Sequence, residues 1–502
     1  MEDSNNTQKR ANPQGSALPG GIITGLLSAV MVVLDVMLVR SALLPMKFLA
    51  PVMILLLVLV ALLGFLTHRT GRTGRFAAGT VVSILMAIIM IYGIIALSML
   101  TNTLNSITTV STEVTHVGVY VLTDDEADTL NDLETDTFGI LSELDRTSTD
   151  GAIQQLNEDL DTEIATEEYD SLVQLVDALY SQECRAILLN SAYLDVIAEI
   201  EGYEDIEDQI REVTGLEVEE VVEEPVAQEP EETESALTAE TGSAFTLYIS
   251  GIDSRNGLKT KSRSDVNILA TVNTETHQVL LVSTPRDYYV PLSISNGVKD
   301  KLTHAGIYGV SVSMDTLAML YDVDVDYYFR VSFEGFEDIV DALGGVSVYS
   351  EYTFTSSFNG QTFVEGYNYV NGEQALAFAR ERYAFATGDR QRGKNQMALI
   401  QAIIKKALSP DILVKYASIL SAVEDNFETS LSYDLIAALV SDQLSTGADW
   451  EVITYSVDGS NGSAVPYSMS TTAYVMIPDE STVATAKELM QAVLNGEVIS
   501  QP

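Results

Sequence analysis

Arginines occur in short, dense motifs in the second half of this acidic chain. Fifteen of the 27 lysines and arginines lie between residues 255 and 406, although the formal net charge is −45. Charge alone would favour surface salt bridges with neighbouring acids, but a planar guanidinium also binds phosphate bidentately. The motifs SRSD (262–265), STPRD (283–287), FARERY (378–383) and GDRQRGKNQ (388–396) carry Arg263, Arg286, Arg380, Arg382, Arg392 and Gln396. Their density predicts a site for a phosphate-bearing anion.

Two aspartates accompany the arginines, Asp253 in SGIDSR (250–255) and Asp265 in SRSD. The chain has four histidines and a single cysteine, Cys184, which excludes an intramolecular disulfide framework and a zinc site of several cysteines. Carboxylate oxygens are the ligands of hard cations such as Mg²⁺. The sequence therefore predicts Mg²⁺ held by Asp253 and Asp265 beside the arginines.

Three predicted strands would bring the first group of these residues together. Enrichment in Val, Ile and Leu between turn residues indicates strands at 245–252, 266–272 and 278–282. The short turn at 273–276 favours a hairpin, and an antiparallel meander places the end of the first strand, the start of the second and the end of the third at one edge. We therefore expect Asp253, Arg263, Asp265 and Arg286 to gather there.

The second group depends on where two helices begin and end. Arg380 and Arg382 would diverge by about 200° on a helix, so they reach one anion together only if the helix capped by Asn371 ends near Ala379. Their alternative role is surface pairing with Glu381 and Asp389. A long helix is expected from Asp389, anchored by an apolar stripe at positions 397, 400, 404 and 408. Arg392 and Gln396 would share one face near its N-terminus, which favours phosphate.

The N-terminal part predicts a membrane anchor. Apolar runs at 21–39, 48–66 and 76–100 are each long enough to span a bilayer as a helix. Basic residues precede the first run and separate the second from the third, which predicts a cytoplasmic N-terminus and an exported remainder. A chain of charge −45 with its main part exported is a poor candidate for binding nucleic acid.

The middle of the chain is strongly acidic. Residues 119–122 indicate a strand, and 169–188 carry apolar residues at helical spacing, so we expect a small α/β accessory domain over 102–216. Residues 217–242 are rich in Glu and interrupted by Pro, as in an extended linker. The charge fits solubility and repulsion from anionic polymers, with cation or wall-component binding as the alternative. The expected domains are thus 1–101, 102–216, 217–242 and 243–502.

Taken together, SGIDSR, SRSDVNIL, STPRD, FARERY and GDRQRGKNQ resemble, in order and spacing, the LytR-CpsA-Psr family of cell-wall glycopolymer transferases. The resemblance is strong over 245–410 and weaker to the end. Three spans and an extra domain resemble the capsule-associated, CpsA-like branch. The implied fold is α/β: three transmembrane helices, a small extracellular α/β domain, and a catalytic domain whose central mixed sheet is flanked by helices.

The resemblance implies a Mg²⁺-assisted phosphotransferase that moves a polyprenyl-pyrophosphate-linked glycopolymer, capsular or teichoic-acid-like, onto a peptidoglycan sugar hydroxyl. Asp253 and Asp265 match the metal-associated acids. The residues that match pyrophosphate ligands are Arg263, Arg286, Arg380, Arg382, Arg392 and Gln396. We expect Asp253, Arg286 and Arg382 to be catalytic, with Asp253 as the base and Asp265 or Asp287 as alternatives. Two other functions stay open: a non-catalytic pyrophosphate-glycan binding or regulatory module, and a pyrophosphatase that uses water.

Overall fold

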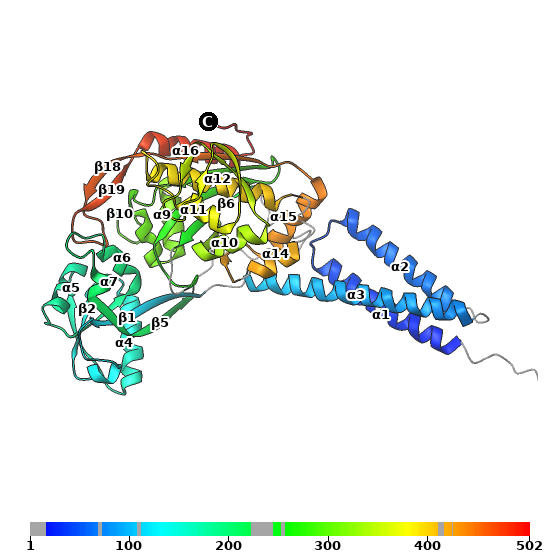
Figure 1. Cartoon of the computed structure of the whole chain (residues 1–502), viewed down its shortest axis with the longest axis horizontal. Helices are drawn as coiled ribbons and strands as arrows, with labels where there is room; N and C mark the ends of the chain where they lie inside the picture. Colours follow the sequence, from blue (N-terminus) through cyan, green and yellow to red (C-terminus); the bar gives the residue numbers. More distant parts are fainter. Residues whose placement is uncertain are drawn as a thin grey trace, which may run out of the picture. The chain divides into compact units, whose positions relative to one another are not determined.

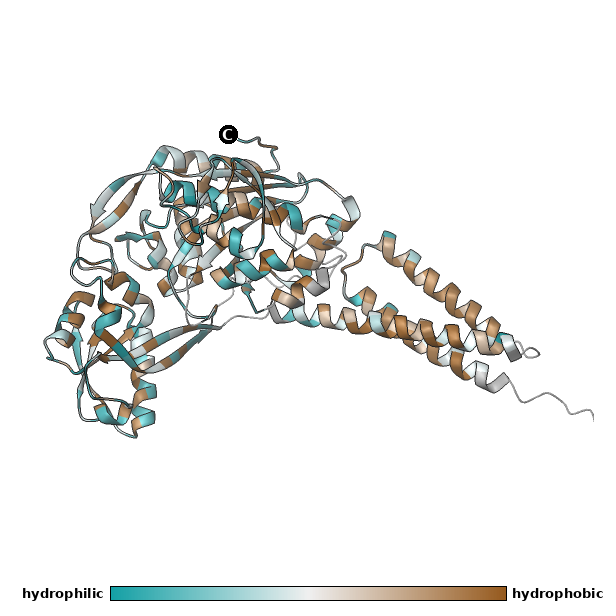
Figure 2. Cartoon of the chain, in the orientation of Figure 1, coloured by the Kyte–Doolittle hydropathy of each residue, from teal (hydrophilic) through white to brown (hydrophobic). Residues whose placement is uncertain are grey.

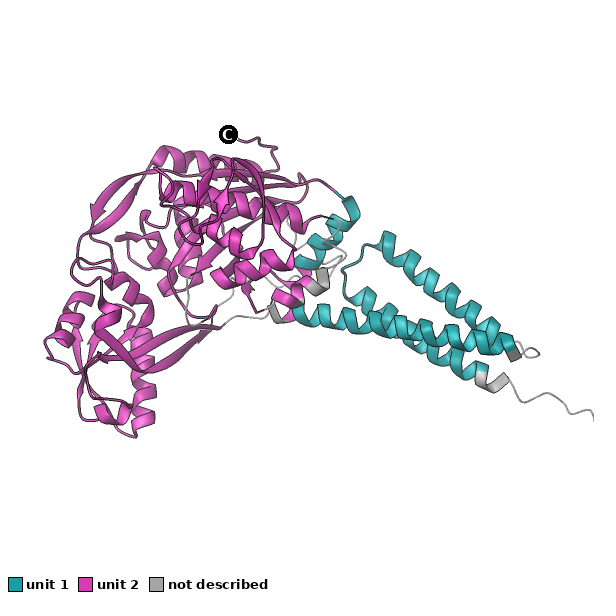
Figure 3. Cartoon of the chain, viewed as in Figure 1, with its two compact units in different colours: residues 1–104, 436–447 teal, residues 105–435, 448–502 magenta. Residues whose placement is uncertain are grey.

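The computed structural model describes residues 17–68, 73–107, 112–221, 244–252, 257–409, 416–423 and 425–502. The chain divides into two compact units, residues 1–104 with 436–447 and residues 105–435 with 448–502 (Figure 3).

The first unit contains three long apolar helices, α1 (Ala17–Arg40), α2 (Met46–His68) and α3 (Thr73–Ile107). Hydrophobic residues predominate along the visible side of all three helices (Figure 2). The stretches Gly20–Arg40, Met46–Thr67 and Gly74–Asn105 are each long and apolar enough to cross a membrane. The prediction of three such helices is confirmed, and α3 continues past the expected end of the anchor at residue 101.

The second unit begins with the α/β accessory domain (Figure 1). Its elements are β1 (Thr112–Leu122), a 3-10 turn (Leu130–Leu133), β2 (Thr137–Leu141), α4 (Arg146–Leu160), β3 (Ala165–Tyr169), α5 (Leu172–Tyr180), β4 (Ala186–Asn190), a 3-10 turn (Ser191–Tyr193), α6 (Leu194–Ile197), α7 (Ile206–Gln209) and β5 (Ile210–Val221). The sheet order is β3-β2-β4-β1-β5. Helix α4 packs on one face with Val117 and Val119, and α5 on the other with Tyr120 and Ile187, as the two-residue period of a strand requires.

Two sequence-based boundaries differ from this structure. The helical pattern over 169–188 is a helix only in α5, and Ile187 and Leu188 belong to the buried strand β4, because a short apolar run fits either element. Strand β5 continues to Val221, which pairs with Thr112. Residues 217–221 are therefore strand and not linker, and the rest of the expected linker lies outside the described residues.

The larger domain is built on a six-stranded mixed sheet in the order β16-β11-β6-β7-β8-β17. Its strands are β6 (Ala244–Ile252), β7 (Ser264–Asn273), β8 (Gln278–Thr284), β11 (Tyr327–Ser332), β16 (Phe427–Thr429) and β17 (Glu451–Ser456). Strands β6, β7 and β8 form the expected antiparallel meander. Strand β11 runs parallel to β6, and β17 runs parallel to β8.

Helices cover both faces of this sheet (Figure 1). On one face, Leu269 and Leu280 pack with α9 and α16. On the other, Ile268 and Leu281 pack with Met397 of α12. The remaining elements are β9 (Tyr289–Pro291), β10 (Lys299–Lys301), η3 (Leu302–Tyr308), α9 (Val310–Tyr321), α10 (Phe333–Ala342), β12 (Val346–Ser350), β13 (Phe354–Thr355), β14 (Thr362–Phe363), β15 (Gly366–Val370), α11 (Gly372–Arg380), α12 (Asp389–Ala407), α14 (Tyr416–Val423), α15 (Tyr433–Thr446), β18 (Gly459–Ala464), β19 (Ala473–Pro478) and α16 (Glu480–Leu494).

A buried ion cluster joins the accessory domain to the larger domain. The Arg330 side chain is 3% exposed and lies between Glu113 of β1 and Glu428 of β16, each at 2.6 Å. Glu113 also accepts a hydrogen bond from the backbone N–H of Val310. Removing one member would leave a buried charge without its counterion, so Arg330 ties Glu113 of the accessory domain to Glu428 of the larger domain.

Candidate anion-binding site

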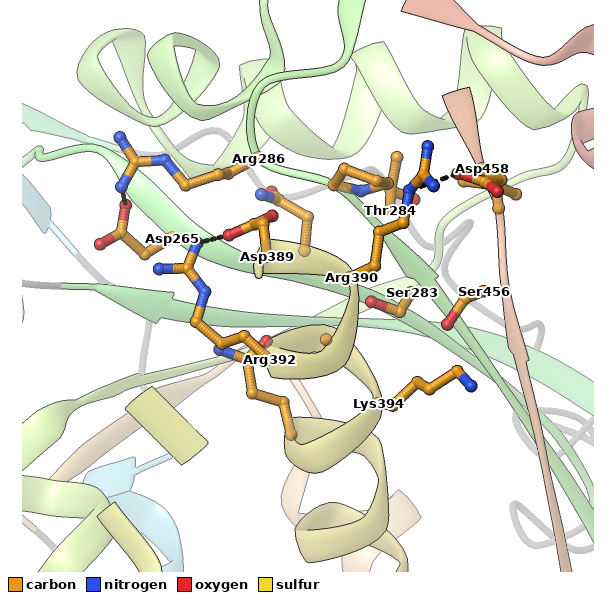
Figure 4. A pocket seen from close by; sticks show the side chains of 15 residues that line it. Asp265, Ser283, Thr284, Arg286, Asp389, Arg390, Arg392, Lys394, Ser456 and Asp458 are labelled. Atoms are coloured by element: carbon orange, nitrogen blue, oxygen red, sulfur yellow. Dashed lines mark hydrogen bonds and ion pairs between the residues drawn. The ribbon is translucent and has the colours of Figure 1, made fainter. Parts of the chain in front are cut away.

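A cavity of about 170 Å³ opens where four elements of the larger domain meet (Figure 4). It lies at the start of β7, the end of β8, the first turns of α12 and the end of β17. The residues that line it are Asp265, Asn267, Ser283, Thr284, Pro285, Arg286, Asp389, Arg390, Arg392, Gly393, Lys394, Gln396, Ser456, Val457 and Asp458. Cationic, amide and hydroxyl groups dominate this lining, as a phosphate-binding site requires.

Strand pairing explains why residues distant in sequence meet here. In the antiparallel pair of β7 and β8, Asn267 lies opposite Thr284. In the parallel pair of β8 and β17, Ser283 lies opposite Ser456. Because parallel strands end at the same edge, the segments that follow β8 and β17 both reach the cavity. Of the four residues expected to gather at this edge, Asp265 and Arg286 line the cavity together.

Arg286 is held between carboxylates at the rim of the cavity. Its Nη1 donates to Asp265 Oδ1 at 2.7 Å, and the side chain is 13% exposed. Burial disfavours the charged guanidinium, but Asp265, Asp287 and Glu199 outweigh it and raise the pKa of Arg286 above its ordinary value. Burial raises the pKa of Asp287, and the charges of Arg286 and Lys301 oppose the shift only in part. The arginine is thus permanently cationic, and Asp287 takes up a proton more readily than an ordinary aspartate.

The N-terminal turn of α12 supplies the facing wall. The helix begins at Asp389 after Gly388, whose φ of 52° is one that favours glycine. Arg392 pairs with Asp389, one turn away on the same helix. Arg390 turns to Asp458, with 2.8 Å between its Nε and the carboxylate (Figure 4). Gln396 lies one turn beyond Arg392, and both line the cavity as their spacing predicts. The positive end of the helix dipole adds to this potential.

Arg263 faces the accessory domain and does not line the cavity. Its guanidinium lies 3.0 Å from Asp195 and 2.7 Å from Glu199. Glu199 also lies 3.2 Å from Arg286 and 2.5 Å from Lys301. Burial opposes ionisation of Glu199, but the charges of Lys301, Arg263 and Arg286 together lower its pKa to about 2. One accessory-domain carboxylate therefore links three cations at the edge of the site.

Arg380 and Arg382 also lie away from the cavity. Helix α11 ends at Arg380, and Glu381 has an extended backbone. This end lies close to Ala379, where the helix has to end if Arg380 and Arg382 are to reach one anion. Arg380 lies over the rings of Phe333 and Phe358, 4.6 Å and 4.9 Å from their centroids. The exposed Arg382 lies over Tyr383 and donates to its hydroxyl at 2.8 Å. The carboxylate of Glu381 instead accepts from Ser357 and Ala384.

The magnesium site stays a prediction. Asp253 lies outside the described residues. Asp265 lines the cavity and points one carboxylate oxygen at Arg286. The carboxylates of Asp265, Asp389 and Asp458 supply the oxygen ligands that a hard cation prefers, whereas the arginine and lysine nitrogens of the lining only donate hydrogen bonds. Among the residues that the structure describes, no three carboxylate, His or Cys side chains gather as a metal site.

Several residues of the site were not singled out from the sequence. They are Lys301 of β10, Arg390 and Lys394 of α12, Ser456 of β17, Asp458, and Glu199 of the accessory domain. The α12 residues could have been predicted from the sequence, since they flank Arg392 on the helix that was predicted. The others depend on long-range pairing: β17 lies beside β8 although about 170 residues separate them in sequence, as the Glu451 and Gln278 pair shows.

The fold and the site define an α/β domain with a cavity lined by four cationic side chains at one sheet edge. The chain belongs to the LytR_cpsA_psr family, whose sequence model matches residues 213–491. It is 38% identical over 199 residues to the polyisoprenyl-teichoic acid–peptidoglycan teichoic acid transferase TagU of Bacillus subtilis, covering 39% of this chain and 63% of that protein. It is 38% identical over 192 residues to TagU of Enterococcus faecalis, covering 38% and 62%.

The chain thus spans a little over three fifths of the length of the curated relatives that it matches. Among solved structures, it is similar to the crystal structure of B. subtilis TagV, with 26% identity and a TM-score of 0.43 over 51% of this chain and 98% of that chain. The family match begins at residue 213, so nearly all of the accessory domain lies outside it.

Proposed function

We propose that this chain is a phosphotransferase that moves a polyprenyl-pyrophosphate-linked anionic glycopolymer onto a hydroxyl of a peptidoglycan sugar. The observation that supports it is the cavity in which Arg286, Arg392 and Gln396, from two motifs of the sequence, face one another beside Asp265. The named relatives transfer teichoic acid to peptidoglycan. Capsular polysaccharide is the alternative polymer, which the three spans and the accessory domain favour.

In the proposed reaction, the acceptor hydroxyl oxygen bonds to the phosphorus that carries the glycan. The bond from that phosphorus to the bridging oxygen breaks, and polyprenyl monophosphate leaves with the electron pair. The acceptor proton passes to a carboxylate, Asp253 in our proposal, with Asp265 or Asp287 as alternatives. Negative charge grows on the phosphate oxygens, so fixed cations such as Arg286 and Arg392 stabilise the transition state more than the ground state.

We also propose that Asp253 and Asp265 hold Mg²⁺, which when bound neutralises charge on the phosphate oxygens. Oxygen donors at the cavity rim support this proposal. The three apolar helices support an anchor that holds the enzyme at the membrane, where a polyprenyl donor resides. The basic residues around the spans support a cytoplasmic N-terminus and an exported catalytic domain.

The test is release of polyprenyl monophosphate by the full chain in detergent, from a synthetic polyprenyl-pyrophosphate glycan with wall fragments as acceptor. Arg392→Ala should lower turnover by roughly 10- to 100-fold, because it removes a charged donor from the phosphate. Arg146→Ala is the matched control, since Arg146 pairs with Asp150 and Glu168 on the accessory-domain surface. Omission of Mg²⁺ tests the metal, and teichoic and capsular donors compared side by side test the polymer.

Three outcomes separate the candidate functions. Polymer attached to wall fragments supports the transferase. Monophosphate released at the same rate with and without wall fragments identifies a pyrophosphatase that uses water. Binding of the donor without release in either condition identifies a non-catalytic binding module.

A further inference from the structure

The accessory domain places a carboxylate among the cations of the site. Glu199 follows α6, and its two oxygens are fully engaged: Oε1 accepts from Arg263 at 2.7 Å and from Arg286 at 3.2 Å, and Oε2 accepts from Lys301 at 2.5 Å. Two guanidinium groups and an ammonium around one anion is the arrangement expected around a phosphate oxygen. The side chain of Lys301 is only 4% exposed, so this ammonium has little contact with water and depends on an anion.

Carboxylates neutralise this group of cations completely. Arg263, Arg286 and Lys301 are met by four acids within 4.0 Å, namely Asp195, Glu199, Asp265 and Asp287. Within the described part of the chain, an incoming anion therefore finds each of these three cations already paired with a carboxylate. It must replace one of the carboxylates before it can bond to these cations.

Glu199 also lies between Arg263 and Arg286, which their sequence motifs assign to the same ligand. Arg286 lines the cavity, whereas Arg263 is turned toward Asp195 and Glu199. A pyrophosphate that contacts both arginines has to take the place of the Glu199 oxygen that they share. The accessory domain need not leave for this to occur, because the buried cluster of Glu113, Arg330 and Glu428 joins the domains elsewhere.

We propose that Glu199 is an affinity-determining residue of this site, an internal anion that the pyrophosphate of the donor displaces and that returns when the product leaves. This rests on the proposed function, since it takes the ligand to be a prenyl pyrophosphate. A carboxylate carries one charge and a pyrophosphate esterified at both ends carries two, so the donor competes successfully where a singly charged anion does not. The accessory domain thereby sets how much negative charge a ligand must carry in order to bind at the site.

The experiment measures binding of a short prenyl pyrophosphate to the full chain in detergent by calorimetry. Glu199→Gln keeps the shape and removes the charge, and we expect at least about tenfold tighter binding, because the ligand no longer displaces a charge-assisted partner. Glu201→Gln is the matched control: Glu201 is exposed and only two residues away, and its loss should change affinity less than about twofold, as for a screened surface charge. Glu199→Asp, which shortens the carboxylate, should fall between them.

A double-mutant comparison tests whether the gain in affinity arises from the contact between Glu199 and Arg263. In an Arg263→Ala background, Glu199→Gln should give a smaller gain, because one of the contacts at stake is already absent. Unchanged or weaker binding by Glu199→Gln, in a protein whose wild type binds and whose Arg392→Ala variant does not, overturns this inference and leaves the proposed function standing. Failure of the wild type and Glu199→Gln to bind the pyrophosphate at all overturns both.

Discussion

Arg286 is the side chain at which the cavity and the accessory domain meet. One edge of its guanidinium bonds to Asp265, which lines the cavity, and the other to Glu199, which does not. Asp265 and Glu199 hold the guanidinium in place before a ligand arrives, and Asp265 remains its partner when the proposed ligand displaces Glu199. Such preorganisation is the main means by which a charged site favours a transition state.

Arg382 gives a sharp test of the sequence-based assignment. It is exposed, and its described contacts are with Tyr383 alone, so Arg382→Ala should leave thermal unfolding of the protein unchanged. We nevertheless expect at least about a 100-fold loss of polyprenyl monophosphate release, the cost of a missing donor to a developing anion. Arg146→Ala serves as the control. Near wild-type turnover in Arg382→Ala would remove this residue from the catalytic group.

The lowered pKa of Glu199 predicts a pH dependence of stability. Because folding lowers this pKa from about 4.5 to about 2, the ionised carboxylate stabilises the folded state at pH values above its unfolded pKa, and this contribution is lost as the pH falls toward 2. The difference in unfolding midpoint between wild type and Glu199→Gln should therefore be constant above about pH 5 and shrink below pH 4.5. A difference that grows on acidification would contradict the charge-paired Glu199.

At the scale of elements, η3 fixes the start of β7 and with it Arg263 and Asp265. Gly306 of η3 packs so closely that a Cβ there would lie 2.4 Å from the carbonyl oxygen of Ser262 and 2.9 Å from the N atom of Ser264. Only a residue without a side chain permits this approach of two backbone segments. The position of Asp265, which lines the cavity, thus depends on η3, which contributes no residue to the described lining of that cavity.

Gly306→Ala should accordingly damage both stability and activity. The backbone around Ser262 and Ser264 has to move, at a cost of about 1–3 kcal/mol in unfolding free energy, and the Asp265–Arg286 pair should shift with it. Denaturant titration and donor turnover measure the two effects. Gly25→Ala is the matched control, since a Cβ at Gly25 meets nothing within 4 Å. Equal unfolding free energies and equal turnover in the two variants would show that the structure accommodates a Cβ at Gly306.

On the scale of the whole molecule, an apolar N-terminal unit is joined to a second unit that carries nearly all of the acidic residues. In the proposed function, a lipid-linked donor and a membrane anchor confine enzyme and substrate to the same surface, which raises their effective concentration. The large negative charge of the second unit repels anionic polymers over about a Debye length, so productive approach of the proposed donor depends on the local basic site.

The proposed orientation predicts a labelling pattern. In a Cys184→Ser background, Glu134→Cys on the accessory-domain surface should react with a membrane-impermeant maleimide in intact cells. Thr70→Cys, between the second and third spans, should react only after the membrane is opened, because the basic residues around it favour the cytoplasmic side. Labelling of Thr70→Cys in intact cells, with Glu134→Cys protected, would reverse the topology.

The sequence by itself determined the elements of this protein and the local order of its motifs. Apolar length predicted three helices that are long enough to span a membrane. Enrichment in Val, Ile and Leu between turn residues predicted the meander of β6, β7 and β8, and an apolar stripe predicted the helix α12 with Arg392 and Gln396 on one face. The meeting of Asp265 with Arg286 followed from that meander. These features rest on interactions between residues close in sequence, which periodicity and turn chemistry report.

Only the tertiary structure decided which residues share the site. It brought β17 beside β8 and so added Ser456 and Asp458, turned Arg380 onto Phe333, and placed Glu199 of another domain against Arg286. These contacts join segments far apart in the chain. They arise because buried charges must find partners and apolar faces must pack together, wherever in the sequence those groups lie.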